Sequence, residues 1–210
     1  MGFMVRATHG IVLLPVVAIY VIIICILKMK GRSYPYLFFF SIFYLYIYVL
    51  VSLTLFPMPF GEAFTGATEF NIRYNIRLIP LLTLNRMDVR TSVLNVLLTI
   101  PFGFGISFIA KMGSKKVILI GFALGLLIES LQLLQGLVAG FTFRIVDVDD
   151  VIFNFIGVMI GYGVFLIFKK IYDNSFDRLV DKSGFKHNSI LLYIRNPVMP
   201  CNVSYDADFV

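Results

Sequence analysis

Five stretches of this chain are each long and apolar enough to cross a lipid bilayer. A spanning helix needs roughly 20 mostly apolar residues, and the five stretches cover residues 11–27, 36–56, 91–110, 117–135 and 149–168. The sequence therefore predicts an all-α, polytopic membrane helix bundle with about five transmembrane helices. A long loop, residues 57–90, separates the second stretch from the third.

The charge content agrees with a membrane location. Only 14% of the residues are charged, whereas a soluble domain is usually about a quarter charged. The net charge of +6 does not indicate a nucleic-acid partner, because the basic residues stand in short runs beside the apolar stretches. We expect one membrane domain, residues 1–170, followed by a cytoplasmic polar tail, residues 171–210. The tail is expected to be partly disordered.

The positions of the basic residues predict an orientation. With the N-terminus outside, twelve of the 18 lysines and arginines, including every lysine, fall on the inner segments. Because cytoplasmic loops of membrane proteins carry an excess of these residues, we expect a multi-pass protein of the cell membrane. Its N-terminus is predicted to be outside and its C-terminus cytoplasmic.

Four arginines in the outer loop run against this rule: Arg73, Arg77, Arg86 and Arg90. Within the stretch EFNIRYNIRLIPLLTL, residues 69–84, Arg73 and Arg77 are four positions apart and would share one face of a helix. A helix that lies on the outer leaflet with an apolar and a basic face would account for them. We therefore expect an amphipathic helix in the outer loop.

The third, fourth and fifth stretches each carry a stripe of polar or small residues on one face. The stripe of the third contains Ser92, Asn95 and Thr99. That of the fourth contains Gly121, Gly125, Glu129 and Gln132. That of the fifth contains Asp147, Asp150, Asn154, Gly157 and Gly161. In the last two, the side chains fall within about 80° on a helical wheel. The glycine pairs let another backbone approach closely, so we interpret them as packing positions.

The three stripes lie at similar depths. Asn95, Glu129 and Asn154 are all within about two turns of the outer surface, at a rise of about 1.5 Å per residue. Three helices packed stripe to stripe would bring them together. Glu129 is the only acidic residue well inside a span, and an ionisable residue there is a functional-site hypothesis by default. It could face an outward cleft as ligand, base or metal contact, or make a buried hydrogen bond between helices.

The charges that precede the fifth stretch also allow two interpretations. Asp147, Asp149 and Asp150 could bind a divalent cation, since Mg²⁺ prefers carboxylate oxygens. Aspartates at a helix start also cap free N–H groups and suit the helix dipole. On that interpretation, we expect Asp147 or Asp149 to cap the helix and Asp150 to face the cleft.

Three arginines are candidate partners for these carboxylates: Arg73, Arg77 and Arg144. An arginine binds phosphate through two parallel hydrogen bonds, so these residues could clamp a lipid phosphate. Alternatively, they could pair with Glu129 and the aspartates. Both interpretations remain open from the sequence.

Three motifs together resemble the VanZ-like family of bacterial membrane proteins. They are NVLLTIPFGFG (residues 95–105), IESLQ (residues 128–132) and RIVDVDDVIFNFIGVMIGYG (residues 144–163). The resemblance covers about residues 55–168. The family's usual Asn-Leu-Ile-Pro-Phe is replaced here by Arg-Leu-Ile-Pro-Leu, residues 77–81. The resemblance implies a link to low-level resistance to the glycopeptide teicoplanin and brings no established reaction.

Three functional hypotheses follow. The first is a membrane factor whose outward polar cleft binds a lipid-linked envelope precursor, a glycopeptide or another amphiphile, with membrane lipids as neighbours. Its ligand-binding candidates are Asn95, Glu129, Gln132, Arg144, Asp147, Asp150 and Asn154, with Arg73 and Arg77. The second is an enzyme on a phosphate-containing lipid, with Glu129 and Asp150 as acid, base or metal ligands. The third is a purely structural role for the stripes. Motifs of serine or zinc hydrolases are absent.

Overall fold

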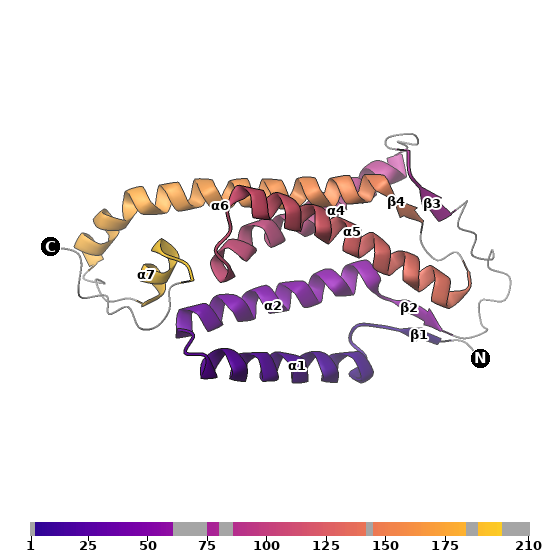
Figure 1. The fold of residues 1–210 in the computed structure, drawn as a ribbon, viewed down its shortest axis with the longest axis horizontal. Coiled ribbons are helices and arrows are strands. Elements are labelled where there is room, and N and C mark those ends of the chain that lie inside the picture. The colour runs from indigo at the N-terminus through magenta and orange to yellow at the C-terminus, as the bar shows by residue number, and fades with distance from the viewer. Residues whose placement is uncertain (1–2, 61–74, 80–85, 142–144, 184–188, 199–210) are drawn as a thin grey trace.

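The computed structural model describes residues 3–60, 75–79, 86–141, 145–183 and 189–198. Within these ranges lie six helices and four short strands (Figure 1). The helices are α1 (Gly10–Met29), α2 (Tyr34–Leu55), α4 (Arg86–Ile109), α5 (Ser114–Ala139), α6 (Val148–Ser183) and α7 (Ser189–Arg195). Five of these, all except α7, are long and apolar enough to span a membrane. The predicted all-α polytopic bundle is therefore confirmed.

The four strands lie together at one end of the bundle (Figure 1). There β1 (Phe3–Val5) pairs antiparallel with β2 (Met58–Phe60). Likewise, β3 (Ile76–Arg77) pairs parallel with β4 (Val146–Asp147). These two ladders join segments that are distant in the sequence, and the second ladder brings β3, from the segment between α2 and α4, to the start of α6.

The predicted amphipathic outer-loop helix falls mostly on residues outside the described ranges. Where that stretch is described, Asn75 is helical, whereas the helical expectation is wrong for Ile76 and Arg77, which form β3. The physical reason is tertiary: their backbone pairs with Val146 and Asp147 of β4. A local pattern of arginines four positions apart contains no information about such a partner.

The closest helix contact is between α4 and α6. A Cβ atom built at Gly161 would collide with the carbonyl oxygen of Ile100, and one at Gly157 would collide with Thr99 and the carbonyl oxygen of Val96. On α5, a Cβ at Gly125 would lie 2.9 Å from the carbonyl oxygen of Val151. The interpretation of these glycines as packing positions is confirmed, and they let α4 and α5 both touch α6.

Tyrosine hydroxyls of α2 attach it to its neighbours. Tyr44 donates to the carbonyl oxygen of Val16 in α1 at 2.8 Å. On another face of α2, Tyr46 donates to the carbonyl oxygen of Leu98 in α4 at 2.7 Å. Because no water competes for these groups inside a bilayer, such bonds hold α2 between α1 and the core helices.

Two helices contain described residues of the predicted polar tail. α6 continues to Ser183, through the predicted domain boundary at residue 170. α7 lies at the end of the bundle opposite the strands (Figure 1). Its Tyr193 is 1% exposed, donates a hydrogen bond to the carbonyl oxygen of Phe108 and stacks on Phe39. Part of the predicted polar tail therefore packs against the bundle.

Candidate functional site

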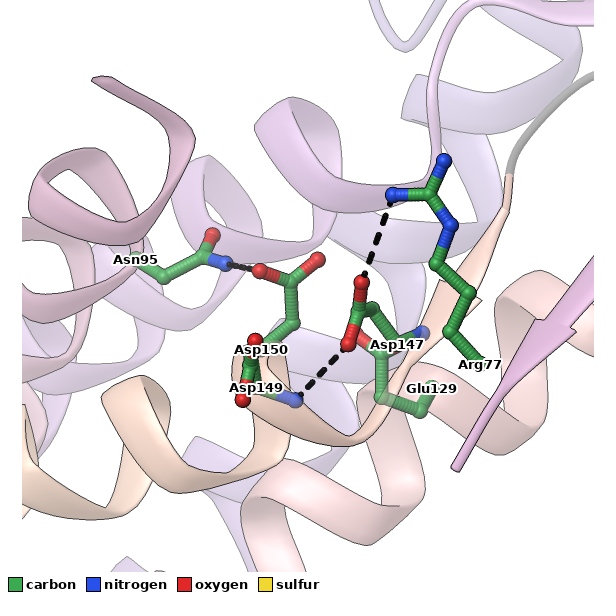
Figure 2. Close-up of polar contacts among 6 residues, drawn as sticks. All are labelled: Arg77, Asn95, Glu129, Asp147, Asp149 and Asp150. Atoms are coloured by element: carbon green, nitrogen blue, oxygen red, sulfur yellow. Dashed lines mark hydrogen bonds and ion pairs between the residues drawn. The ribbon is translucent and has the colours of Figure 1, made fainter. Parts of the chain in front are cut away.

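The polar stripes of α4, α5 and α6 meet at the strand end of the bundle. Figure 2 shows Asn95 from α4 and Glu129 from α5 beside the aspartates that begin α6, with Arg77 reaching in from β3. We call Asn95, Glu129, Asp147, Asp150 and Asn154 the polar cluster. The clustering arises because Gly125, Gly157 and Gly161 let the three helices approach closely at and below this level.

Glu129 is buried within the cluster, with 4% of its surface exposed. Its Oε2 accepts a hydrogen bond from the backbone N–H of Asp147 at 3.2 Å. A buried carboxylate without hydrogen bonds would be strongly unfavourable. The hydrogen bond from the start of α6 therefore stabilises the buried side chain of Glu129. It also links α5 to α6.

Asp147 is the N-cap of α6. Its Oδ1 accepts a hydrogen bond from the backbone N–H of Asp149 at 3.0 Å. Its Oδ2 lies 3.7 Å from Nη1 of Arg77 in the parallel strand pair. The expectation that Asp147 or Asp149 caps the helix is confirmed for Asp147. The same side chain also forms an ion pair with β3.

Asp150 faces α4. Its Oδ1 accepts a hydrogen bond from Nδ2 of Asn95 at 2.6 Å. One turn further along, Thr99 of α4 donates to the carbonyl oxygen of Asn154 at 2.9 Å. These contacts place Asn95, Asp150 and Asn154 on one shared seam between α4 and α6, as their helical spacing predicted.

Asn154 is the least satisfied member of the cluster. It is 1% exposed, yet within the described residues neither Nδ2 nor Oδ1 has a hydrogen-bond partner. A buried amide without partners costs about 1–3 kcal/mol. Native proteins retain few such groups, and each calls for an explanation such as a function or a bound water or ion.

Gln132 ties α5 to the end of α2. Its Nε2 donates to the carbonyl oxygen of Thr54 at 3.2 Å. Gln135, three residues further along α5, donates in the same way to the carbonyl oxygen of Leu55 at 2.7 Å. Sequence reasoning missed Thr54 and Gln135, although a threonine at the end of an aromatic span and a second glutamine three residues after Gln132 were available as signals.

A cavity of about 520 Å³ adjoins the polar cluster between α2, α4 and α5. Two predicted site residues, Asn95 and Gln132, line it together with Thr54 and Thr91. The remaining walls are the leucines Leu53, Leu94, Leu97 and Leu98. Asn95 therefore has two neighbours: it bonds to Asp150 on one side and borders the cavity on the other.

The predicted cation site is not assembled as a carboxylate cluster. Across the described ranges, no group of three or more His, Cys, Asp or Glu side chains is placed to hold a metal ion. Asp147 is occupied as a cap and Asp150 bonds to Asn95, so a divalent cation on Asp147, Asp149 and Asp150 stays a prediction. Arg73 and Arg144 lie outside the described residues, and Arg77 is the predicted arginine that the structure places at the cluster.

Substitutions of Asp147 test its capping role. Asp147→Ala is expected to lower the free energy of unfolding by about 1 kcal/mol, because Ala cannot accept the N–H of Asp149. Asp147→Asn keeps a capping oxygen and loses only a half-exposed ion pair with Arg77, which is worth little. Thermal unfolding of both variants in one detergent would measure the difference. Equal losses in both would contradict the capping role and point to the charge instead.

Comparison with protein families gives a match over much of the chain. A protein-family model described as VanZ/LLP1 matches residues 43–169, which is more than half of the chain. No curated protein matches the chain, and no solved structure does. The matched range begins in α2 and includes the whole polar cluster and the walls of the adjoining cavity.

Proposed function

The chain belongs to the VanZ/LLP1 family of membrane proteins, and on that premise we propose that it is a cell-envelope factor that lowers susceptibility to teicoplanin. In this proposal the polar cluster and its cavity bind the polar part of a lipid-linked or amphiphilic ligand. Glu129 and Asp150 recognise the ligand, while Asn95, Gln132 and Asn154 orient it.

One observation supports the proposal: a buried carboxylate and a buried amide without a side-chain partner occur in one cluster, and that cluster borders a cavity through Asn95. Glu129 and Asn154 are almost fully enclosed, and Asn154 makes no side-chain hydrogen bond within the described residues. Packing alone would favour apolar residues at such positions. Polar groups that are costly to bury, in a cluster that borders a cavity, are characteristic of binding sites.

The proposed orientation places this cluster at the outer face. Lys28, Lys111 and Lys115 stand at the ends of α1 and α4 and the start of α5, away from the strands. By the positive-inside rule, that end is cytoplasmic. The N-terminus and the cluster would then face outward, where a ligand of the cell envelope is accessible. Labelling of single cysteines at either end of the bundle with an impermeant thiol reagent in intact cells would test this orientation. Labelling only at the lysine end would show the opposite orientation.

The functional test is a susceptibility assay on Glu129→Gln and Asp150→Asn. Each variant keeps the side-chain shape and removes the charge, so each is expected to return a susceptible host to the teicoplanin sensitivity of cells without the protein. Asp173→Asn is the matched control, because Asp173 pairs with Lys169 at the far end of α6. Membrane levels of all three must equal the wild type.

A purely structural role is the competing candidate, and specific contacts favour it. Glu129 bonds to the N–H of Asp147 and Asn95 bonds to Asp150, so both pairs join helices. On that reading, Glu129→Gln at normal abundance would leave tolerance unchanged, since the amide oxygen can accept the same hydrogen bond. Full tolerance in both cluster variants would therefore rule out the proposed ligand recognition.

A further inference from the structure

We infer that the cavity between α2, α4 and α5 is a binding site for a neutral glycolipid of the membrane. The sugar hydroxyls would occupy this cavity, and an acyl chain of the same molecule would occupy an apolar cavity next to it. The inference rests on the proposed function and deepens it, because it names the class of ligand that lies beside Asn95.

The lining of the first cavity selects an uncharged head group. Its polar residues are Thr54, Thr91, Asn95 and Gln132, and none of the described residues that line it is charged. Phosphate sites are normally built with arginine or lysine, which supply charged donors. A phosphate placed here would meet only neutral side chains, whereas hydroxyl groups can both donate to and accept from hydroxyls and amides.

Gln132 and Asn95 indicate which hydrogen-bonding groups the ligand should carry. Gln132 is 9% exposed, and its Nε2 is engaged with the carbonyl oxygen of Thr54. Asn95 uses its Nδ2 in the same way on Asp150. Within the described residues, no hydrogen bond reaches Oε1 of Gln132 or Oδ1 of Asn95. Both amides therefore have an acceptor left over, and acceptors call for a ligand with O–H or N–H donors.

The second cavity has the character of an acyl-chain site. It measures about 390 Å³ and lies between α2 and α5. Its lining includes Leu50, Val51 and Leu55 from α2 and Leu124, Leu127 and Leu131 from α5. Thr54 lines this cavity and the polar one, so the two spaces meet at the last turn of α2. One space is apolar and the other has hydroxyl and amide groups, which matches a molecule with a chain and a sugar.

The volumes and positions of the two cavities are consistent with the binding of a single amphiphilic molecule. The polar cavity is large enough for a sugar ring, by the usual range of ligand sites, roughly 300–1,000 Å³. Both cavities are bordered by membrane-spanning helices, so lipids of the bilayer are the molecules that reach them most directly. Acyl chains fill such spaces through van der Waals packing, since no water has to be displaced.

The test is native mass spectrometry of the purified full-length protein with an equimolar mixture of two probes. These are diglucosyldiacylglycerol and phosphatidylglycerol with identical acyl chains. We expect the wild type to retain the diglucosyl lipid preferentially. Gln132→Leu should reduce that retention about tenfold, since one hydrogen bond of about 1.4 kcal/mol corresponds to a factor of ten.

Two further variants make the result specific. Ser130→Ala removes an exposed hydroxyl from another face of α5, one that bonds only within its own helix to the carbonyl oxygen of Leu126, and should retain the lipid like the wild type. Leu98→Phe adds bulk to the cavity wall without changing any polar group and should also reduce retention. If Gln132→Leu fails to fold, the retention measured for Leu98→Phe tests the proposed site.

Equal or stronger retention of phosphatidylglycerol by the wild type would overturn the inference, as would unchanged retention in Gln132→Leu and Leu98→Phe. These outcomes are independent of the susceptibility assay. A protein that prefers the glycolipid but gives no teicoplanin tolerance would support this site and contradict the proposed function. A protein that gives teicoplanin tolerance without preferring the glycolipid would support the proposed function and contradict this site.

Discussion

Gly161→Ala is expected to lower the amount of folded protein in the membrane several-fold. A Cβ at this position would overlap the carbonyl oxygen of Ile100 and lie 2.9 Å from the backbone nitrogen of Phe104. Because both neighbours are backbone atoms, no side-chain rotation can relieve the overlap, and α4 and α6 must separate. Overpacking typically costs about 1–3 kcal/mol, and this case belongs at the upper end, against a total stability of about 5–15 kcal/mol.

Gly163→Ala is the matched control for this prediction. It lies two residues further along α6, and a Cβ there would have no atom within 4 Å. Alanine also has the higher helix propensity, so Gly163→Ala should be neutral or slightly stabilising. Membrane abundance and thermal unfolding in detergent would compare the two. Similar abundance and melting of both variants would contradict the close α4–α6 contact.

Asn154→Leu is expected to raise stability and remove function. Leucine has the same branched arrangement of side-chain heavy atoms, and it would replace an amide whose two polar atoms have no partners within the described residues. Removing that unsatisfied group should raise the free energy of unfolding by about 1–3 kcal/mol. If Asn154 helps to orient a ligand, the same variant should lose teicoplanin tolerance. Thermal unfolding and the susceptibility assay would be measured on one preparation of cells.

Ser107→Ala is the control that separates the expected effect on stability from the expected effect on teicoplanin tolerance. Its hydroxyl is also buried without a partner in the described part of the chain, but Ser107 lies in the last turn of α4, towards the far end of the bundle. It should be neutral or stabilising and keep full tolerance. A fall in stability of Asn154→Leu would show that an ordered water or another group satisfies the amide, and would remove the argument that this residue is retained for function.

Much of the candidate site could be predicted from helical periodicity. Glu129, Asp150 and Asn154 lie where a repeat of three or four residues places them, on faces that meet other helices. The cap at Asp147 was also predictable, because capping depends on a side chain and a backbone group two residues away. These features are local, so one segment of sequence contains all of their causes.

The rest depended on contacts between distant segments. The parallel pairing that makes Ile76 and Arg77 a strand joins residues about seventy positions apart. Burial of Tyr193 requires Phe39 and Phe108 from two other helices. The participation of Thr54 in both cavities depends on how α2 lies against α4 and α5. None of these arrangements has a period or a motif within a single segment.

The sequence alone determined which segments enter the membrane and which face of each core helix is polar, because hydropathy and helical spacing are properties of consecutive residues. The tertiary structure decided which polar groups pair, which remain without partners and where space is left between helices. Those outcomes depend on backbone approach at Gly125, Gly157 and Gly161. A polar stripe becomes a site only when three helices come close enough to exclude lipid from it while leaving room beside Asn95 and Gln132.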